Sequence, residues 1–157
     1  MDIQHCTKAS FCVIGKEGTT QDGEGFIGRL WDAANAGFHE VVPLAKVDAE
    51  GNIAGFWGAM SDFSLSFRPW ELGFSQGRYL AGVEANDDAA APAGWTKWVI
   101  PGYEYLYVKV ESDAPGTFSA VIAYMQEHAL HLAGAVHDFI CPHEAGQAYM
   151  FFPIRKL

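Results

Sequence analysis

The sequence predicts an α+β fold in which an antiparallel sheet carries two helices on one face. Three observations lead to this prediction. The order strand, helix, strand, strand occurs twice along the 157 residues, each helical segment has one apolar stripe, and a polar connection separates the two sets. We therefore predict a single domain over residues 1–157, built from half-repeats at about 8–86 and 95–157 that are related by pseudo-two-fold symmetry.

The first half begins with a short apolar segment, residues 11–15, which indicates a buried strand. The period then changes, because apolar residues recur at steps of one, three and four between residues 25 and 37, as in an amphipathic helix. The apolar stripe of this helix comprises Phe26, Ile27, Leu30, Trp31, Ala34 and Phe38. Two extended stretches follow at residues 53–61 and 78–85, and a loop rich in Phe, Pro and Gly separates them.

The second half follows a connection at residues 86–94, whose small and acidic residues are typical of an exposed link. Residues 103–110 then alternate as a strand, and a helical pattern follows with Thr117 as its expected N-cap. The apolar positions of this helix are Phe118, Val121, Ile122, Met125, Ala129 and Leu132. Two further strands are expected at residues 135–140 and 148–154, joined by a turn that contains proline and glycine.

Composition and charge restrict the classes of function. The 19 acidic residues outnumber the 10 basic ones, so the surface repels phosphate backbones and direct nucleic-acid binding is not expected. No apolar run approaches the roughly 20 residues that a membrane helix needs, and the start of the chain lacks the pattern of a signal peptide. The three cysteines are too few for a disulfide scaffold. We therefore expect a soluble, cytoplasmic protein that binds no membrane.

Three segments resemble the GyrI-like family of small-molecule-binding domains. They are the strand at residues 77–84 (GRYLAGVE), the junction at residues 94–101 (GWTKWVIP) and the closing hairpin from residues 138–139 to residues 152–154. The resemblance extends over residues 11–154. This family includes the effector-binding domains of AraC-type and multidrug-responsive transcription regulators. It implies two repeats about a pseudo-two-fold axis and a central, aromatic-lined groove for small, often cationic molecules, here in a stand-alone form.

Aromatic side chains are the first candidates for ligand binding. Tyr103, Tyr105 and Tyr107 project from one face of their strand, and the opposite face is mainly aliphatic. Such a wall could stack against a cationic or ring-bearing ligand, and Trp57 and Trp98 are expected to join it. The alternative is that these tyrosines only cover a half-exposed face of the sheet.

Acidic residues are the second set of candidates. Glu84 lies in an apolar strand and Glu104 lies among tyrosines, where a carboxylate is costly without a partner. In the resembling family, a glutamate followed two positions later by an aromatic residue often lies at the floor of the groove, and Asp138 with the adjacent Phe139 stands at that place here. A carboxylate buried against rings would have a raised pKa and would favour a cationic ligand. The alternative for each acid is a solvated charge or a simple ion pair.

Three functions of different classes remain open. The first is stand-alone binding of a hydrophobic or cationic effector or drug, with a separate DNA-binding regulator or a second copy of the chain as partner. The second, implied by the resemblance, is hydrolysis of cyclopropane-bearing alkylating compounds with Glu84 or Glu104 as the general base. The third, ranked lowest, is a protein interaction of the gyrase-inhibitor type. No cofactor is expected, and the six histidines lack the strong spacings of a metal site.

Overall fold

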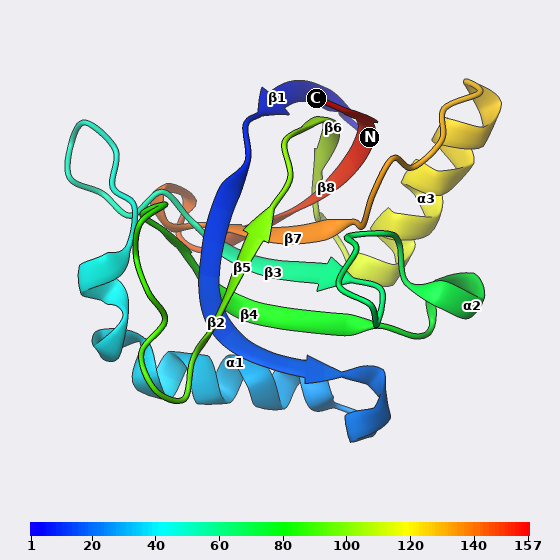
Figure 1. Cartoon of the computed structure of the whole chain (residues 1–157). Coiled ribbons are helices and arrows are strands. Elements are labelled where there is room, and N and C mark those ends of the chain that lie inside the picture. The colour runs from blue at the N-terminus through cyan, green and yellow to red at the C-terminus, as the bar shows by residue number, and fades with distance from the viewer.

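The computed structural model describes residues 1–157 and contains a single sheet of eight antiparallel strands with helices on one face (Figure 1). The strands are β1 (Gln4–Lys8), β2 (Phe11–Thr19), β3 (Phe56–Ser61), β4 (Arg78–Ala85), β5 (Thr96–Ile100), β6 (Tyr103–Lys109), β7 (His137–Cys141) and β8 (Gln147–Lys156). The α-helices are α1 (Phe26–Gly37), α2 (Glu71–Phe74) and α3 (Ala114–Glu127). The predicted α+β class is confirmed. None of these helices has the length and apolar character needed to cross a membrane.

The strand order across the sheet is β1-β6-β8-β7-β3-β4-β2-β5. The first strand–helix–strand–strand set supplies the adjacent strands β3-β4-β2, and the second set supplies β6-β8-β7. Each edge strand pairs with the set that it does not precede in the chain. β1 precedes the first set but pairs with β6 of the second set, and β5 precedes the second set but pairs with β2 of the first set. Each set therefore completes the sheet of the other, and the two sets meet where β3 pairs with β7.

The seam between β3 and β7 is a short ladder. It pairs Phe56 with Ile140, Trp57 with Phe139 and Gly58 with Asp138. Beyond Gly58 the backbone pairing of β3 with β7 ends. There the Met60 N–H donates to a side-chain atom, Nδ1 of the buried His137, at 3.0 Å. Burial lowers the pKa of His137 to about 3, so this imidazole remains a neutral acceptor.

Alternation along the strands produces two apolar layers. The helix face packs against α1 through Ile14, Tyr79, Ala81 and Val83, and against α3 through Leu106, Val108, Met150 and Phe152. The other face carries a group that we name the opposite-face cluster: Phe11, Val13, Trp57, Ala59, Leu80, Trp98, Ile100, Tyr103, Tyr105 and Phe151. This cluster joins residues of β5 and β6, which lie near opposite edges of the sheet. The sheet therefore curls until its edges pack against each other, and in Figure 1 β2 and β5 cross in front of β3 and β4.

Three features of the secondary structure differ from the prediction. Helix α3 ends at Glu127, so Ala129, which has a positive φ of 54°, and Leu132 follow the helix instead of continuing its apolar stripe. The edge strands β1 and β5 were not expected, since a strand of five residues gives little periodicity. In β5 the side chains of Trp98 and Ile100 are buried and that of Val99 between them is exposed, which is the alternation typical of a strand. The N-cap of α3 is Asp113 rather than Thr117, because the Asp113 carboxylate accepts from the Gly116 N–H at 2.6 Å.

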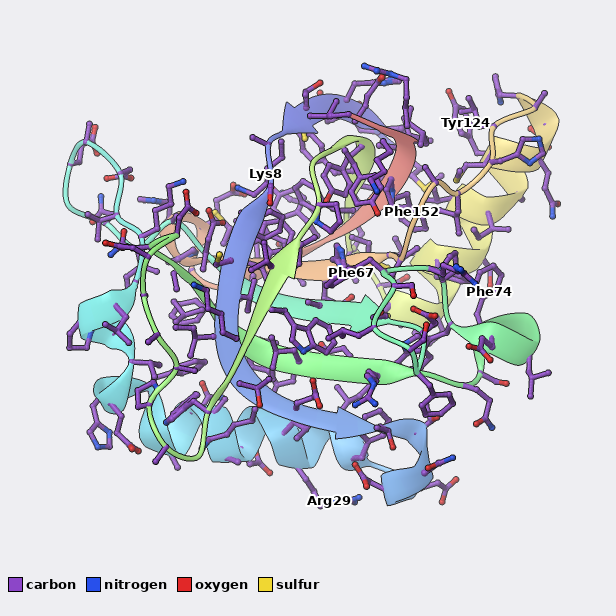
Figure 2. The ribbon with its side chains drawn as sticks, in the orientation of Figure 1. Lys8, Arg29, Phe67, Phe74, Tyr124 and Phe152 are labelled. Carbon is purple, nitrogen blue, oxygen red and sulfur yellow. The ribbon has the colours of Figure 1, made fainter.

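Glu84 is the buried acid of the opposite face. One carboxylate oxygen accepts from Trp57 Nε1 at 2.9 Å, and the other lies 3.1 Å from Lys8 Nζ. The Lys8 ammonium also lies 4.5 Å from the centre of the Phe11 ring, and Figure 2 shows Lys8 where β1 leads into β2. Glu104 differs, because it pairs with Arg155 at 2.9 Å near the surface, where the Arg155 side chain is 63% exposed and the Glu104 side chain is 30% exposed. Only Glu84 is therefore part of the packed interior.

We expect Glu84→Ala to lower the free energy of unfolding by about 2–4 kcal/mol, because the buried Trp57 N–H loses its acceptor and Lys8 loses its partner. Glu104→Ala removes an exposed ion pair, and the expected loss is at most about 1 kcal/mol. Urea denaturation of the two variants measures the difference. Equal losses would contradict the structural role assigned to Glu84.

Candidate functional site

A groove of about 490 Å³ opens on the helix face, where the two halves meet at β3 and β7. Its walls come from α1, α3 and the β3–β4 connection, and its floor comes from β3, β7 and β8. The main apolar lining residues are Ile27, Met60, Trp70, Phe74, Phe118, Val136 and Met150. The one charged side chain of the lining is Asp138. A hollow of similar volume beside β1 and α3 is lined mostly by polar residues, among them Asp2 and Lys109.

Asp138 lies at the floor of the groove and belongs to no ion pair of the structure. Its carboxylate accepts from the Tyr79 hydroxyl at 2.9 Å, and that hydroxyl accepts from Trp31 Nε1 at 3.1 Å. Burial raises the pKa of Asp138 to about 6, although the hydrogen bond from Tyr79 opposes this shift. Burial, with the nearby charge of Asp138, keeps the pKa of Tyr79 well above its ordinary value, so Tyr79 remains a donor. The groove thus holds a carboxylate without a cationic partner.

Gly58 makes this hydrogen bond possible. Tyr79 lies on β4 and Asp138 on β7, and β3 runs between these strands. The Tyr79 ring crosses β3 at Gly58, where a Cβ atom would overlap the phenol oxygen and also approach the Asp138 Cβ to 3.2 Å. The absence of a side chain at Gly58 therefore lets a residue of the first half reach an acid of the second.

The outer wall of the groove comes from the β3–β4 connection, residues 62–77. Trp70 donates from Nε1 to the Arg78 carbonyl at 2.9 Å, which fixes its indole. Phe74 packs edge-on against Phe118 of α3 with ring centres 5.1 Å apart, and Figure 2 shows Phe74 between α2 and α3. The connection contains four non-glycine residues with positive φ, namely Leu65, Phe67, Leu72 and Phe74. Such backbone is strained, so surrounding contacts must hold it in place.

Asp62 supplies part of that support at the base of the connection. Its buried carboxylate accepts from the Ser61 hydroxyl at 3.0 Å, the Ser64 hydroxyl at 2.5 Å and the Ser66 N–H at 2.9 Å. Burial alone would raise the pKa of Asp62, but these hydrogen bonds lower it below its ordinary value. Asp62 therefore remains ionised and holds the start of the outer wall.

The structure separates the residues that the sequence singled out for binding. Asp138 lies in the groove, whereas Phe139 points to the other face, because neighbouring strand residues alternate, and packs on Trp57 at 4.6 Å. Tyr107 is half-buried and stacks on Phe151 at 5.0 Å, on that same face. The remaining aromatic candidates belong to the opposite-face cluster and are buried: Trp57, Trp98, Tyr103 and Tyr105. The structure therefore does not bring the predicted aromatic wall and Asp138 together.

The two carboxylates assigned to hydrolysis also lie outside the groove. Both oxygens of Glu84 are engaged, by Trp57 and by Lys8, and Glu104 is paired with Arg155 rather than with a tyrosine. A general base needs a free oxygen within reach of a water and a substrate. The geometry therefore gives the hydrolase alternative no support.

Several groove residues were missed at the level of sequence, among them Trp70 and Phe74, which lie in the segment expected to be a loop. The hydrogen-bond partner of Asp138, Tyr79, was missed as well. Tyr79 lies within the quoted GRYLAGVE segment, but its partner is 59 positions away, so no local spacing could reveal the pair. Ile27 and Phe118 were correctly placed on the apolar stripes of two helices, and those stripes supply facing walls of the groove. Helical periodicity predicts the apolar stripe of each helix, but it does not predict that the two stripes stand apart and leave a groove between them.

No family model matches the sequence, and no curated protein matches it. Solved structures do match over nearly the whole chain. The structure of SAV2435 bound to tetraphenylphosphonium superposes with a TM-score of 0.68 at 17% identity, over 99% of this chain and 94% of that one. The C-terminal domain of EcmrR superposes with a TM-score of 0.63 at 11% identity, over 99% and 98% of the two chains. In the EcmrR–DNA complex, with a TM-score of 0.59 at 10% identity, 99% of this chain covers 58% of the longer EcmrR chain.

The chain has the GyrI-like fold. The resemblance seen in the sequence is thereby confirmed at the level of architecture, since identities this low speak for the fold alone. Within this GyrI-like fold, the groove lies on the helix face at the pairing of β3 with β7.

We expect Gly58→Ala to destabilise the protein by about 1–3 kcal/mol, because the new methyl group forces Tyr79 away from Asp138. Removing the hydroxyl that clashes should relieve part of this cost, so the double variant Gly58→Ala/Tyr79→Phe should lose less than the sum of the two single losses. Chemical denaturation of the four proteins in this cycle measures the coupling. Strict additivity would show that Gly58 and Tyr79 do not interact in this way.

Proposed function

We propose that this protein binds a lipophilic organic cation in the groove, with Asp138 as the counter-charge. The observation behind the proposal is that Asp138 is the one charged side chain in an otherwise apolar groove and has no cationic partner. Keeping an ionised carboxylate there costs free energy, and a bound cation would offset that cost. The rings of Trp70, Phe74 and Phe118 offer further cation–π contacts of about 0.5–2 kcal/mol each.

The solved structures of the same fold support a binding role. One of them holds tetraphenylphosphonium, a lipophilic cation, and another is the C-terminal domain of a protein that has been solved in complex with DNA. We infer that the present chain captures or senses hydrophobic cations, drugs among them, in the cytoplasm. In this proposal a separate DNA-binding regulator, or a second copy of the chain, is its partner in transcription control.

Isothermal titration with tetraphenylphosphonium tests the central claim. We expect saturable binding to the natural protein and at least about tenfold weaker binding to Asp138→Asn, which corresponds to about 1.4 kcal/mol. The matched control is Asp88→Asn, which removes the same charge from an exposed loop residue and should leave the affinity unchanged. An affinity that is equal in Asp138→Asn and the natural protein would exclude Asp138 as the counter-charge.

The pH dependence of binding provides a second test. Asp138 has a pKa of about 6 in the free protein, so protons compete with the cation below that pH, and the carboxylate is ionised above it. We expect an affinity that is constant above about pH 7 and falls about tenfold as the pH drops from 7 to 5. Asp138→Asn should show a flat profile over that range. A profile that falls equally in both proteins would assign the titration to another group.

A further inference from the structure

A second hollow lies on the helix face, next to the groove. Its volume is about 410 Å³, and it is lined by Trp31, Asn35, Phe38, Phe56 and Ile140. These residues come from α1, β3 and β7, three of the elements that also build the groove. The two hollows therefore share a common framework.

The floor continues from one hollow to the other along the seam. On β3 the helix face shows Met60 in the groove, then Gly58, which is covered by the Tyr79 phenol, and then Phe56 in the second hollow. On β7 it shows Asp138 in the groove and Ile140 in the second hollow, and the register pairs Gly58 with Asp138 and Phe56 with Ile140. At about 3.3 Å per residue, the four steps from Met60 to Phe56 span about 13 Å.

The α1 wall advances in the same direction. Ile27 lines the groove, Trp31 stands one turn later and lines the second hollow, and Phe38 at the end of the helix meets Phe56 with ring centres 5.0 Å apart. A chain of hydrogen bonds runs from Trp31, which lines the second hollow, through Tyr79 to Asp138, which lines the groove. This chain marks the boundary between the two hollows.

We propose that the two hollows are the chambers of one continuous trough, with the Asp138 carboxylate near the boundary between them. The preferred ligand is then a lipophilic cation whose charge is central and whose two apolar arms reach in opposite directions, one into each chamber. This inference rests on the proposed function and specifies the ligand class. A cation with a single arm fills one chamber and leaves the other to water.

Two synthetic cations distinguish these cases by isothermal titration. (3-Phenylpropyl)trimethylammonium has one arm, and bis(3-phenylpropyl)dimethylammonium has two arms of the same length on the same charge. We expect the two-armed cation to bind at least about tenfold more tightly, because a second ring leaves water. Both affinities should fall in Asp138→Asn.

Asn35→Trp blocks the second chamber from an exposed position of α1, where a larger side chain leaves the core untouched. It should reduce the advantage of the two-armed cation to about threefold or less. Ala33→Trp places the same side chain at an exposed position of α1 outside either lining, and should keep the full advantage.

Equal affinities for the two cations, each sensitive to Asp138→Asn, would overturn the two-chamber trough and leave the proposed function standing. An advantage that persists in Asn35→Trp would also overturn it, because the second arm would then lie elsewhere. Affinities for both cations that do not respond to Asp138→Asn would instead contradict the proposed function itself.

Discussion

The pairing of β3 with β7 is the contact on which the rest of the structure depends. Three residue pairs make up this ladder, and each pair faces one of two layers. Phe56–Ile140 and Gly58–Asp138 form the floor of the groove and its neighbouring hollow, while Trp57–Phe139 packs into the opposite side of the sheet. A shift of this register by one residue would exchange the two sets and move Asp138 out of the groove.

Glu84 and Asp138 show how environment decides the role of a carboxylate. Glu84 has a lysine and an indole N–H as partners, so its charge is already compensated within the folded protein. Asp138 has one phenol donor and no cation, in surroundings that disfavour its ionised form. The chemical group is the same, but of these two carboxylates only that of Asp138 lacks a cationic partner. That difference is why we propose Asp138 as the binding group, whereas Glu84 has a structural role.

The two faces of the sheet differ in what their aromatic residues do: most of those on one face pack against each other, and several on the other line the groove. Curling of the sheet buries the rings of the opposite-face cluster against one another, which leaves them little surface for a ligand. On the helix face, α1 and α3 diverge over the seam, and the β3–β4 connection closes one side with Trp70 and Phe74. Asp62 holds the start of that connection through Ser64 and Ser66. The groove therefore lies on the helix face, whereas most rings of the opposite face are packed and only a smaller hollow opens beside Tyr107, Phe139 and Phe151.

The sequence by itself determined the α+β class, the order of β2, α1, β3, β4, β6, α3, β7 and β8, and the main apolar stripes of α1 and α3, because these depend on local periodicity. It also pointed to Asp138, through the resemblance to the GyrI-like family. Tertiary structure alone decided which acids are compensated, that Phe139 and the tyrosines at 103 and 105 pack away from the groove, and that Tyr79 reaches Asp138 across Gly58. These features depend on strand register and on the curl of the sheet, which set contacts between residues far apart in the chain and leave no periodic trace in the sequence.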